Sequence, residues 1–272
     1  MIARNNDSRP AMLVKLLLAT LVVALAGAGT VHAAEDCAKP EKQEGELSES
    51  TYAAVQSAME MLGKQKAGEA IEKLEKLADT GSNYEKALVN YNIGIAYSSK
   101  NDYPGAVKAF ARALAANALP PQQREQLQYN LGQLYIVTGQ FDEGIKVLQG
   151  YIATACGTVS PEAHIFLANA LTEKKRYQEA LPQIDQAIAK SKEVKEVWLQ
   201  MKLAIAYEMK DYKGCAEALV YLIGRVPEKS DYWKQLSGVF YEMKSDAEAV
   251  AVLALAERQG MLQKPQEVKN LY

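Results

Sequence analysis

Few side chains in this sequence are suited to chemistry. Only two histidines are present, His32 and His164, and His32 lies in the first 33 residues. A zinc site or a histidine-based relay needs several such groups brought together. The sequence contains no phosphate-binding loop and no nucleophile motif, and its paired carboxylates have the density of an ordinary solvated helix surface. We therefore expect no enzyme, no metal site and no cofactor, and we interpret His164 as a packing residue.

The chain has three cysteines, Cys37, Cys156 and Cys215. In an oxidising compartment, an odd number allows at most one bridge within the chain and leaves one thiol over. Cys215 occupies a small-residue place in the repeat described below, so we expect it to be buried. Cys37 and Cys156 could form a disulfide if the N-terminal tail folds back. The alternative is that both thiols stay unpaired.

Residues 1–33 have the features of an export signal. Arg4, Arg9 and Lys15 precede or interrupt the apolar run LLLATLVVALAGA, and Val31-His32-Ala33 suits signal peptidase. The pattern predicts cleavage before Ala34 and a periplasmic mature chain. The alternative is an uncleaved membrane anchor, but Lys15 leaves an apolar run that is short for a hydrocarbon core of about 30 Å.

The charge balance argues against nucleic acid as a partner. The whole chain has 31 basic and 33 acidic side chains, for a formal charge of −2. Removing residues 1–33 removes three basic groups and Asp7, which leaves 28 basic and 32 acidic side chains and a charge of −4. Nucleic-acid binding needs a basic face that displaces counterions, so we expect none here.

A repeat of about 35 residues organises the rest of the chain. The segment YNIGIAYSSKNDYPGAVKAFARAL, residues 91–114, sets its pattern. This segment resembles the tetratricopeptide repeat, which has an apolar residue at position 7, a small one at position 8, an aromatic near 11, Ala at 20, a large apolar residue at 24 and Ala at 27. Those places are taken here by Ile93, Gly94, Tyr97, Ala106, Phe110 and Ala113. Position 8 then recurs six times, at Ala58, Gly94, Gly132, Ala168, Leu203 and Ser237.

Alternating small and bulky side chains predict the fold. Two antiparallel helices approach closely only where a small residue removes bulk, and one hairpin cannot bury its apolar stripe alone. The resemblance implies an all-α, right-handed α-solenoid of about six helical hairpins, followed by a C-terminal capping or truncated helix.

The domain organisation follows from the same repeat. We expect a signal peptide at 1–33, a flexible polar tail at 34–50 and a solenoid at 51–272. The predicted units lie near 51–84, 87–120, 125–158, 161–193, 196–229 and 230–263, and residues 264–272, KPQEVKNLY, are predicted to start a further helix.

The resemblance also implies a binding surface. In this repeat family the first helix of each hairpin lines a concave groove, and positions 2, 5, 9, 12 and 13 point into it. An aromatic and acidic groove of this kind suits an extended basic peptide, above all a proline-rich one. The alternative is that individual tyrosines pack between repeats. The candidate groove residues are Tyr91, Ile95, Tyr129, Gln133, Asn169, Glu173, Tyr207, Glu208, Tyr241 and Glu242.

A narrower resemblance suggests a role. The cysteine at 37, the stretch YEMKDYKGCAEALVYLIGRVPEKSDYWKQLSGVFYEMKSDAEAVAVLALAERQG and the final KNLY are similar to periplasmic tetratricopeptide proteins that accompany TonB-type energy-transducing complexes. This resemblance implies a non-enzymatic scaffold whose partners are TonB-complex subunits or other Pro/Lys-rich periplasmic segments. It implies contact with the membrane only through those partners or an uncleaved leader.

A second interpretation stays open at this point. An adaptor for cell-envelope assembly, in secretion, pilus or cell-wall machinery, would have the same repeat and the same exported context. Recovery of TonB-complex subunits or of cell-wall enzymes after mild crosslinking in the periplasm would separate the two.

Overall fold

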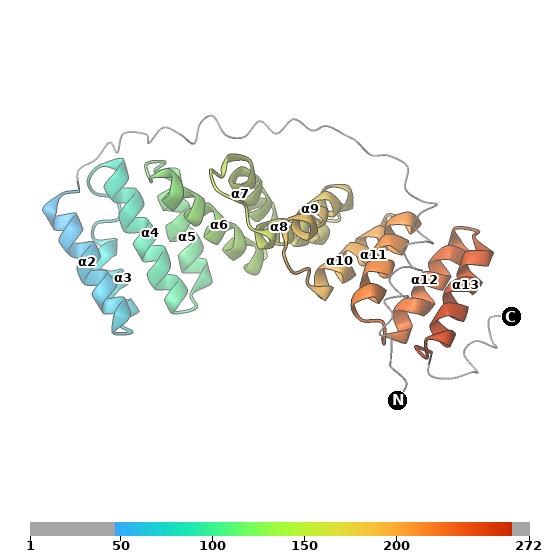
Figure 1. Cartoon of the computed structure of the whole chain (residues 1–272). Helices are drawn as coiled ribbons and strands as arrows, with labels where there is room; N and C mark the ends of the chain where they lie inside the picture. The colour runs from blue at the N-terminus through green and yellow to red at the C-terminus, as the bar shows by residue number, and fades with distance from the viewer. Residues whose placement is uncertain (1–46, 263–272) are drawn as a thin grey trace. The chain divides into compact units, whose positions relative to one another are not determined.

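The computed structural model describes residues 47–262, and every regular element in that range is an α-helix. The predicted signal peptide, nearly all of the 34–50 tail and the predicted helix at 264–272 lie outside these residues. The helices are α2 (Glu49–Gly63), α3 (Ala67–Glu75), α4 (Asn83–Ser99), α5 (Tyr103–Ala115), α6 (Pro121–Val137), α7 (Phe141–Thr154), α8 (Pro161–Glu173), α9 (Tyr177–Lys190), α10 (Glu196–Glu208), α11 (Tyr212–Arg225), α12 (Ser230–Glu242) and α13 (Asp246–Arg258) (Figure 1).

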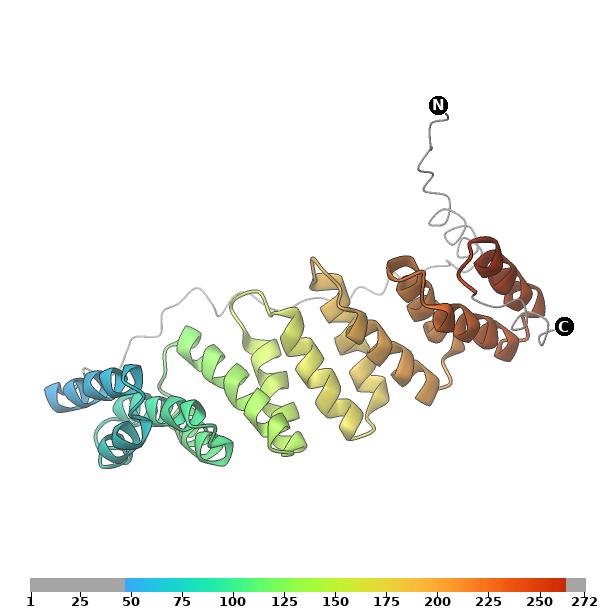
Figure 2. The ribbon, with the colours of Figure 1, turned by 90° about the horizontal axis from the view of Figure 1, so that it is seen from below.

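The described helices pair in chain order into six hairpins, α2/α3 to α12/α13. We call the first helix of each hairpin helix A and the second helix B. The expectation of an all-α helical-repeat solenoid is confirmed. The chain divides after Lys190 into two compact units, which we call the N-terminal unit (α2–α9) and the C-terminal unit (α10–α13). Within each unit, helix B of one hairpin packs against helix A of the next (Figure 2).

Local signals in the sequence explain where the helices begin. The side chains of five capping residues accept a hydrogen bond from the backbone N–H three residues on, which satisfies a group that the helix itself cannot pair. Pro121 and Pro161 each take the first helical position, where a missing N–H costs nothing. Pro182 lies inside α9, and the helix continues through it. The five capping residues are Ser48, Ser82, Asp102, Ser160 and Asp211.

Each hairpin turns through one residue in the left-handed backbone region. The six residues follow helix A at the same place in each repeat, with φ between 55° and 76°, and only one of them is glycine. Turns at Asn101-Asp102, Thr138-Gly139 and Lys210-Asp211 follow from the sequence. The turn residues are Gln65 (φ 60°), Asn101 (58°), Gly139 (76°), Lys175 (57°), Lys210 (55°) and Lys244 (60°).

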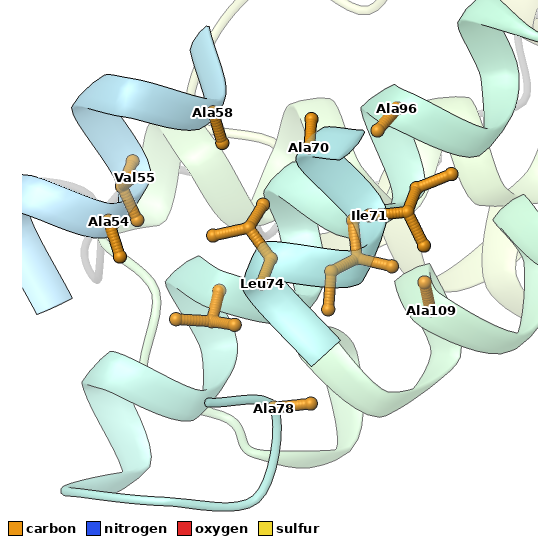
Figure 3. Close-up of a cluster of buried hydrophobic side chains, with 11 residues drawn as sticks. Ala54, Val55, Ala58, Ala70, Ile71, Leu74, Ala78, Ala96 and Ala109 are labelled. Atoms are coloured by element: carbon orange, nitrogen blue, oxygen red, sulfur yellow. The ribbon is translucent and has the colours of Figure 1, made fainter. Parts of the chain in front are cut away.

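Small residues at repeat position 8 bring the two helices of a hairpin together. A side chain on Gly94 in α4 would collide with the ring of Phe110 in α5. A Cβ on Gly132 would lie 2.6 Å from Leu148 Cγ. Ala58 and Ala168 take the same place in their hairpins and are fully buried. Figure 3 shows how such small residues meet bulky ones such as Leu74 at the start of the N-terminal unit.

Glu85 joins the first two hairpins. Its Oε1 accepts hydrogen bonds from the backbone N–H (3.0 Å) and the hydroxyl (2.5 Å) of Ser48, which caps α2. Its Oε2 accepts from the backbone N–H of Ser82, which caps α4, at 2.8 Å. Because the Ser48 hydroxyl and these amides favour the ionised carboxylate, the pKa of Glu85 falls to about 2.

Candidate functional site

In the N-terminal unit, the first predicted groove residues take part in packing. Tyr91 and Ile95 lie on α4 and pack, half-buried, against the apolar cluster that contains Phe110 and Leu131. The rings of Tyr91 and Phe110 are 5.7 Å apart, within the range of a favourable aromatic pair. Burial raises the pKa of Tyr91. Tyr91 is thus mainly a packing residue between α4 and α5.

Tyr129 on α6 has a similar place. Its ring centroid lies 5.7 Å from that of Tyr151 on α7 and 6.3 Å from that of Phe166 on α8. The side chain is half-buried, so it connects its own hairpin to the next one. For Tyr91 and Tyr129, the structure therefore favours the interpretation that groove tyrosines pack between helices.

The remaining predicted residues of this unit are less enclosed. Gln133 on α6 and Asn169 on α8 are half-buried, and Glu173 is exposed. Glu173 is the last residue of α8. The N-terminal unit thus places one exposed acidic group at the C-terminal end of a helix A.

The C-terminal unit exposes its two predicted tyrosines. Tyr207 on α10 is 39 % exposed and Tyr241 on α12 is 62 % exposed. Both belong to the tetrapeptide Tyr-Glu-Met-Lys, which occurs at 207–210 and again at 241–244. Each copy spans the end of a helix A and places its lysine at the left-handed turn. Two consecutive A helices therefore present the same aromatic and acidic group at the same place.

Small residues lie one turn before each tyrosine. Ala204 precedes Tyr207 and Gly238 precedes Tyr241 by three residues, and both are exposed. No atom lies within 4 Å of where a Gly238 side chain would begin. The surface one turn before each of the two tyrosines therefore carries only a small side chain or none. This feature was missed from sequence alone, although the repeated tetrapeptide marks it.

The acidic groups of this surface end their helices. Glu208 is the last residue of α10 and Glu242 the last of α12, and both are exposed. Neither has an ion-pair partner within residues 47–262. The C-terminus of a helix carries a partial negative charge, which adds to that of each carboxylate. The two groups together favour a cationic ligand.

A hydrogen-bond network joins the N-terminal ends of α10 and α12. The Tyr232 hydroxyl donates to Glu196 Oε1 at 2.6 Å, and the Gln200 amide donates to the Tyr232 oxygen at 2.7 Å. Lys229 pairs with Glu196 at 2.5 Å. Hydrogen bonds from Lys229 and Tyr232 lower the pKa of Glu196. The network fixes the two A helices that present Tyr207 and Tyr241, and sequence reasoning missed it because it depends on how α10 and α12 pack.

His164 is enclosed between α8 and α9. It is 3 % exposed, and its two ring nitrogens lie 2.9 Å from Gln183 Oε1 and 3.0 Å from Lys190 Nζ. The lysine ammonium can only donate, so Nε2 accepts and Nδ1–H donates to Gln183. Burial lowers the pKa of His164, and Lys190 lowers it further against the opposing effect of Gln183. With both nitrogens occupied, His164 acts in packing.

Two of the three cysteines, Cys156 and Cys215, lie within residues 47–262. Cys215 is buried and free, as expected from its repeat position. Burial, together with the Asp211 carboxylate, raises the pKa of Cys215 to about 11, so its thiolate is scarce at neutral pH. Cys37 lies outside the described residues, and the pairing of Cys37 with Cys156 stays a prediction.

A pocket of about 600 Å³ is lined by none of the predicted groove residues. It is formed by α3, α4 and α5, and its lining includes Arg112 and Glu75, which form an ion pair 2.9 Å long. Tyr97 and Gly105 form part of its wall. No cluster of three or more metal-binding side chains occurs in residues 47–262, and none of the helices described there is long and apolar enough to span a membrane.

The architecture defines the class of this protein as a helical-repeat protein built from stacked helical hairpins. A model of the tetratricopeptide repeat matches residues 55–123, 91–157 and 129–193. These overlapping matches span 55–193, slightly over half of the chain. The chain belongs to the tetratricopeptide repeat family, whose members generally mediate protein–protein interactions.

Solved structures show the same fold at low sequence identity. A tetratricopeptide repeat protein from Parabacteroides merdae aligns with a TM-score of 0.52 at 14 % identity, over 78 % of this chain and 80 % of that one. YrrB aligns with a TM-score of 0.51 at 14 % identity, over 74 % and 98 %. MamA aligns with a TM-score of 0.50 at 21 % identity, over 64 % and 91 %. No curated protein sequence matches the chain significantly.

Proposed function

We propose that this protein is a periplasmic, non-enzymatic scaffold that binds extended, Pro/Lys-rich segments of partner proteins on the A-helix surface of its C-terminal unit. The observation that carries the proposal is the pair of exposed tyrosines, Tyr207 and Tyr241, each followed by an exposed glutamate on consecutive A helices. We call Tyr207, Glu208, Tyr241 and Glu242 the tyrosine–glutamate surface.

The chemistry of this surface selects its ligand. A tyrosine ring offers a large contact area and loses little conformational entropy when it is covered. Proline-rich segments are already extended, so they too lose little entropy on binding. Lysine side chains of the partner would meet Glu208 and Glu242, which lack ion-pair partners within residues 47–262. One solved protein of this fold, YrrB, is described as having an unusual peptide-binding site, which makes peptide binding a reasonable hypothesis here.

The finer role follows from the resemblance to periplasmic repeat proteins of TonB-type complexes. We propose that the protein is an accessory component of such an energy-transduction and import system, since the periplasmic part of TonB is rich in proline and lysine. The proposed location requires export. N-terminal sequencing of the protein from a periplasmic extract should give a chain that begins at Ala34, whereas a chain that keeps residues 1–33 in the membrane fraction would contradict it.

A peptide titration tests the binding proposal. A Pro/Lys-rich peptide is titrated into the wild type and into a Tyr207→Ala, Tyr241→Ala double variant. Truncating a central aromatic contact commonly costs about 2 kcal/mol, so we expect at least about tenfold weaker binding for the pair. Tyr221→Ala is the matched control, because Tyr221 is 45 % exposed but lies on a B helix, α11. Equal affinities for all three proteins would refute the proposal.

A further inference from the structure

The pocket formed by α3, α4 and α5, which we call the α5 pocket, has a largely apolar wall. Tyr97 on α4 lines it together with Gly105, Ala111 and Ala115 on α5. Gly105 lies directly against the tyrosine ring, since a Cβ at this glycine would be 2.6 Å from Tyr97 Cδ1. Ala111 and Ala115 are one helical turn apart, so they lie on the same side of α5. The side chains on this side are too short to fill the space beside the ring.

The short side chains belong to α5 and not to the repeat. Gly105 and Ala111 occupy repeat positions 19 and 25. In the other three B helices of the N-terminal unit, both positions carry longer polar side chains. These are Glu69 and Glu75 on α3, Glu143 and Gln149 on α7, and Glu179 and Asp185 on α9. Within this unit, α5 alone therefore leaves both positions open.

Two cationic side chains line the α5 pocket. Lys108 and Arg112 are four residues apart on α5, so they project from the same side of the helix. Arg112 Nη2 donates to Glu75 Oε1 at 2.9 Å, and a guanidinium has four further N–H donors for another acceptor. Lys108 is exposed and forms no ion pair within residues 47–262. The lining thus has two positive charges and one negative charge.

We propose that the α5 pocket binds an acidic segment of a partner protein in which a large apolar side chain lies next to a carboxylate. The apolar side chain packs against Tyr97 and the alanines of α5. The carboxylate pairs with Lys108 and with the remaining N–H groups of Arg112. A volume of about 600 Å³ is within the range of pockets that enclose ligands. Charge complementarity selects the occupant, because a basic segment would meet two like charges.

The apolar and the charged parts of the pocket have different roles. An exposed ion pair contributes little to affinity, so most of the affinity comes from the apolar side chain that the pocket encloses. The carboxylate contributes to specificity, since a like charge in its place is repelled. The tyrosine–glutamate surface has the opposite preference for basic segments. The chain would then have two docking sites for partners of opposite charge.

Fluorescence anisotropy tests the proposal with the full chain. The probe is a labelled peptide of sequence Ser-Glu-Phe-Glu-Ser with blocked ends. We expect Lys108→Glu, which repels the peptide, and Ala115→Trp, which fills the pocket, each to bind it at least about tenfold more weakly than the wild type. Lys146→Glu and Ala153→Trp are the matched controls. They change exposed residues at the same two repeat positions on α7, outside the pocket lining, and should leave the affinity unchanged.

Several results would overturn the proposal. One is equal affinity of the wild type and of either pocket variant, with both folded by circular dichroism. Others are an equal loss in the α7 controls, equally tight binding of a peptide in which glutamine replaces both glutamates, or a wild-type dissociation constant above about 1 mM. The Tyr207→Ala, Tyr241→Ala double variant should bind the acidic peptide normally. Lys108→Glu should bind the Pro/Lys-rich peptide normally, so failure here is distinct from failure of the proposed function.

Discussion

At the scale of single residues, His164 shows how burial decides between chemistry and packing. A lone histidine is a natural candidate for catalysis, but here Gln183 and Lys190 occupy both of its ring nitrogens. Both partners are on α9, 19 and 26 residues away in the chain. A sequence pattern cannot indicate such contacts because they depend on how α8 and α9 rotate against each other. The sequence predicted the packing role correctly without identifying the partners.

The buried His164 predicts a dependence of stability on pH. Its pKa is lowered in the folded state from the usual 6.5, so the unfolded state binds more protons once the pH falls below that value. Stability is therefore fully present above pH 6.5 and decreases below it, by at most about 1.4 kcal/mol per pH unit. Denaturant titrations between pH 7.5 and pH 5, chosen to span the usual histidine pKa of about 6.5, should give a smaller decrease for His164→Gln. An equal decrease would contradict this assignment.

The turn lysines adopt a backbone conformation that lysine does not favour. Asn and Gly are common in the left-handed region, and Asn101, Gly139 and Lys210 all lie at turns that the sequence predicts. Lys175, Lys210 and Lys244 adopt the same conformation without any such preference. The repeat forces this conformation because each hairpin closes in the same way.

Replacing one turn lysine should stabilise the protein. The left-handed conformation costs a non-glycine residue roughly 1 kcal/mol, so Lys210→Gly should raise the free energy of unfolding by about 0.5 kcal/mol after the entropy cost of glycine. Lys213→Gly, three residues on and inside α11, should lower it by about 1 kcal/mol. Thermal unfolding of both variants checks the sign. A destabilised Lys210→Gly would show that the lysine side chain itself matters in the turn.

At the scale of helices, most of the packing that the sequence predicted correctly was indicated by the small residues at position 8. Gly94 and Gly132 were expected to mark close contacts between helices, and a side chain at either place would meet Phe110 or Leu148. This prediction succeeded because a close contact between two helices leaves no room for a large side chain, so the position can be recognised by its small residue. The roles of Tyr91 and Tyr129 were harder to predict, since a tyrosine at position 5 can pack or face a ligand.

A glycine-to-alanine pair tests the steric argument. Alanine is favoured over glycine inside a helix by about 1 kcal/mol, and Gly238→Ala should show this gain because the space around Gly238 is open. Gly94→Ala should instead lower the free energy of unfolding, by about 1–3 kcal/mol, because it overpacks the contact with Phe110. Chemical denaturation gives both values. A gain at Gly94 would contradict the close approach of α4 and α5.

At the scale of the whole molecule, the period predicted the number of hairpins but not the division into two units after Lys190. The repeat pattern continues past residue 190 without a break. It reflects contacts within hairpins, and it does not indicate how extensively one hairpin packs against the next. The two units also differ in how they use their tyrosines. The N-terminal unit buries them in part, while the C-terminal unit exposes Tyr207 and Tyr241.

The predicted disulfide between Cys37 and Cys156 would tie the N-terminal tail to the hairpin of α6 and α7. Such a bridge closes a loop of more than 100 residues, and loops of that size stabilise a fold by about 5 kcal/mol in the chain-entropy model. Non-reducing peptide mapping of the mature protein should recover the two cysteines in one cross-linked peptide. The matched Cys215→Ser variant should keep that peptide, whereas alkylation of both Cys37 and Cys156 in the native protein would exclude the bridge.

The central claim is that the A-helix surface of the C-terminal unit receives an extended basic segment. Photo-crosslinking of a Pro/Lys-rich peptide that carries a photoreactive phenylalanine analogue, followed by mass spectrometry, locates the ligand directly. We predict crosslinks on α10 and α12 near Tyr207 and Tyr241, which an excess of unlabelled peptide removes. Crosslinks confined to the B helices α11 and α13, or spread over the chain and unaffected by competition, would contradict the account.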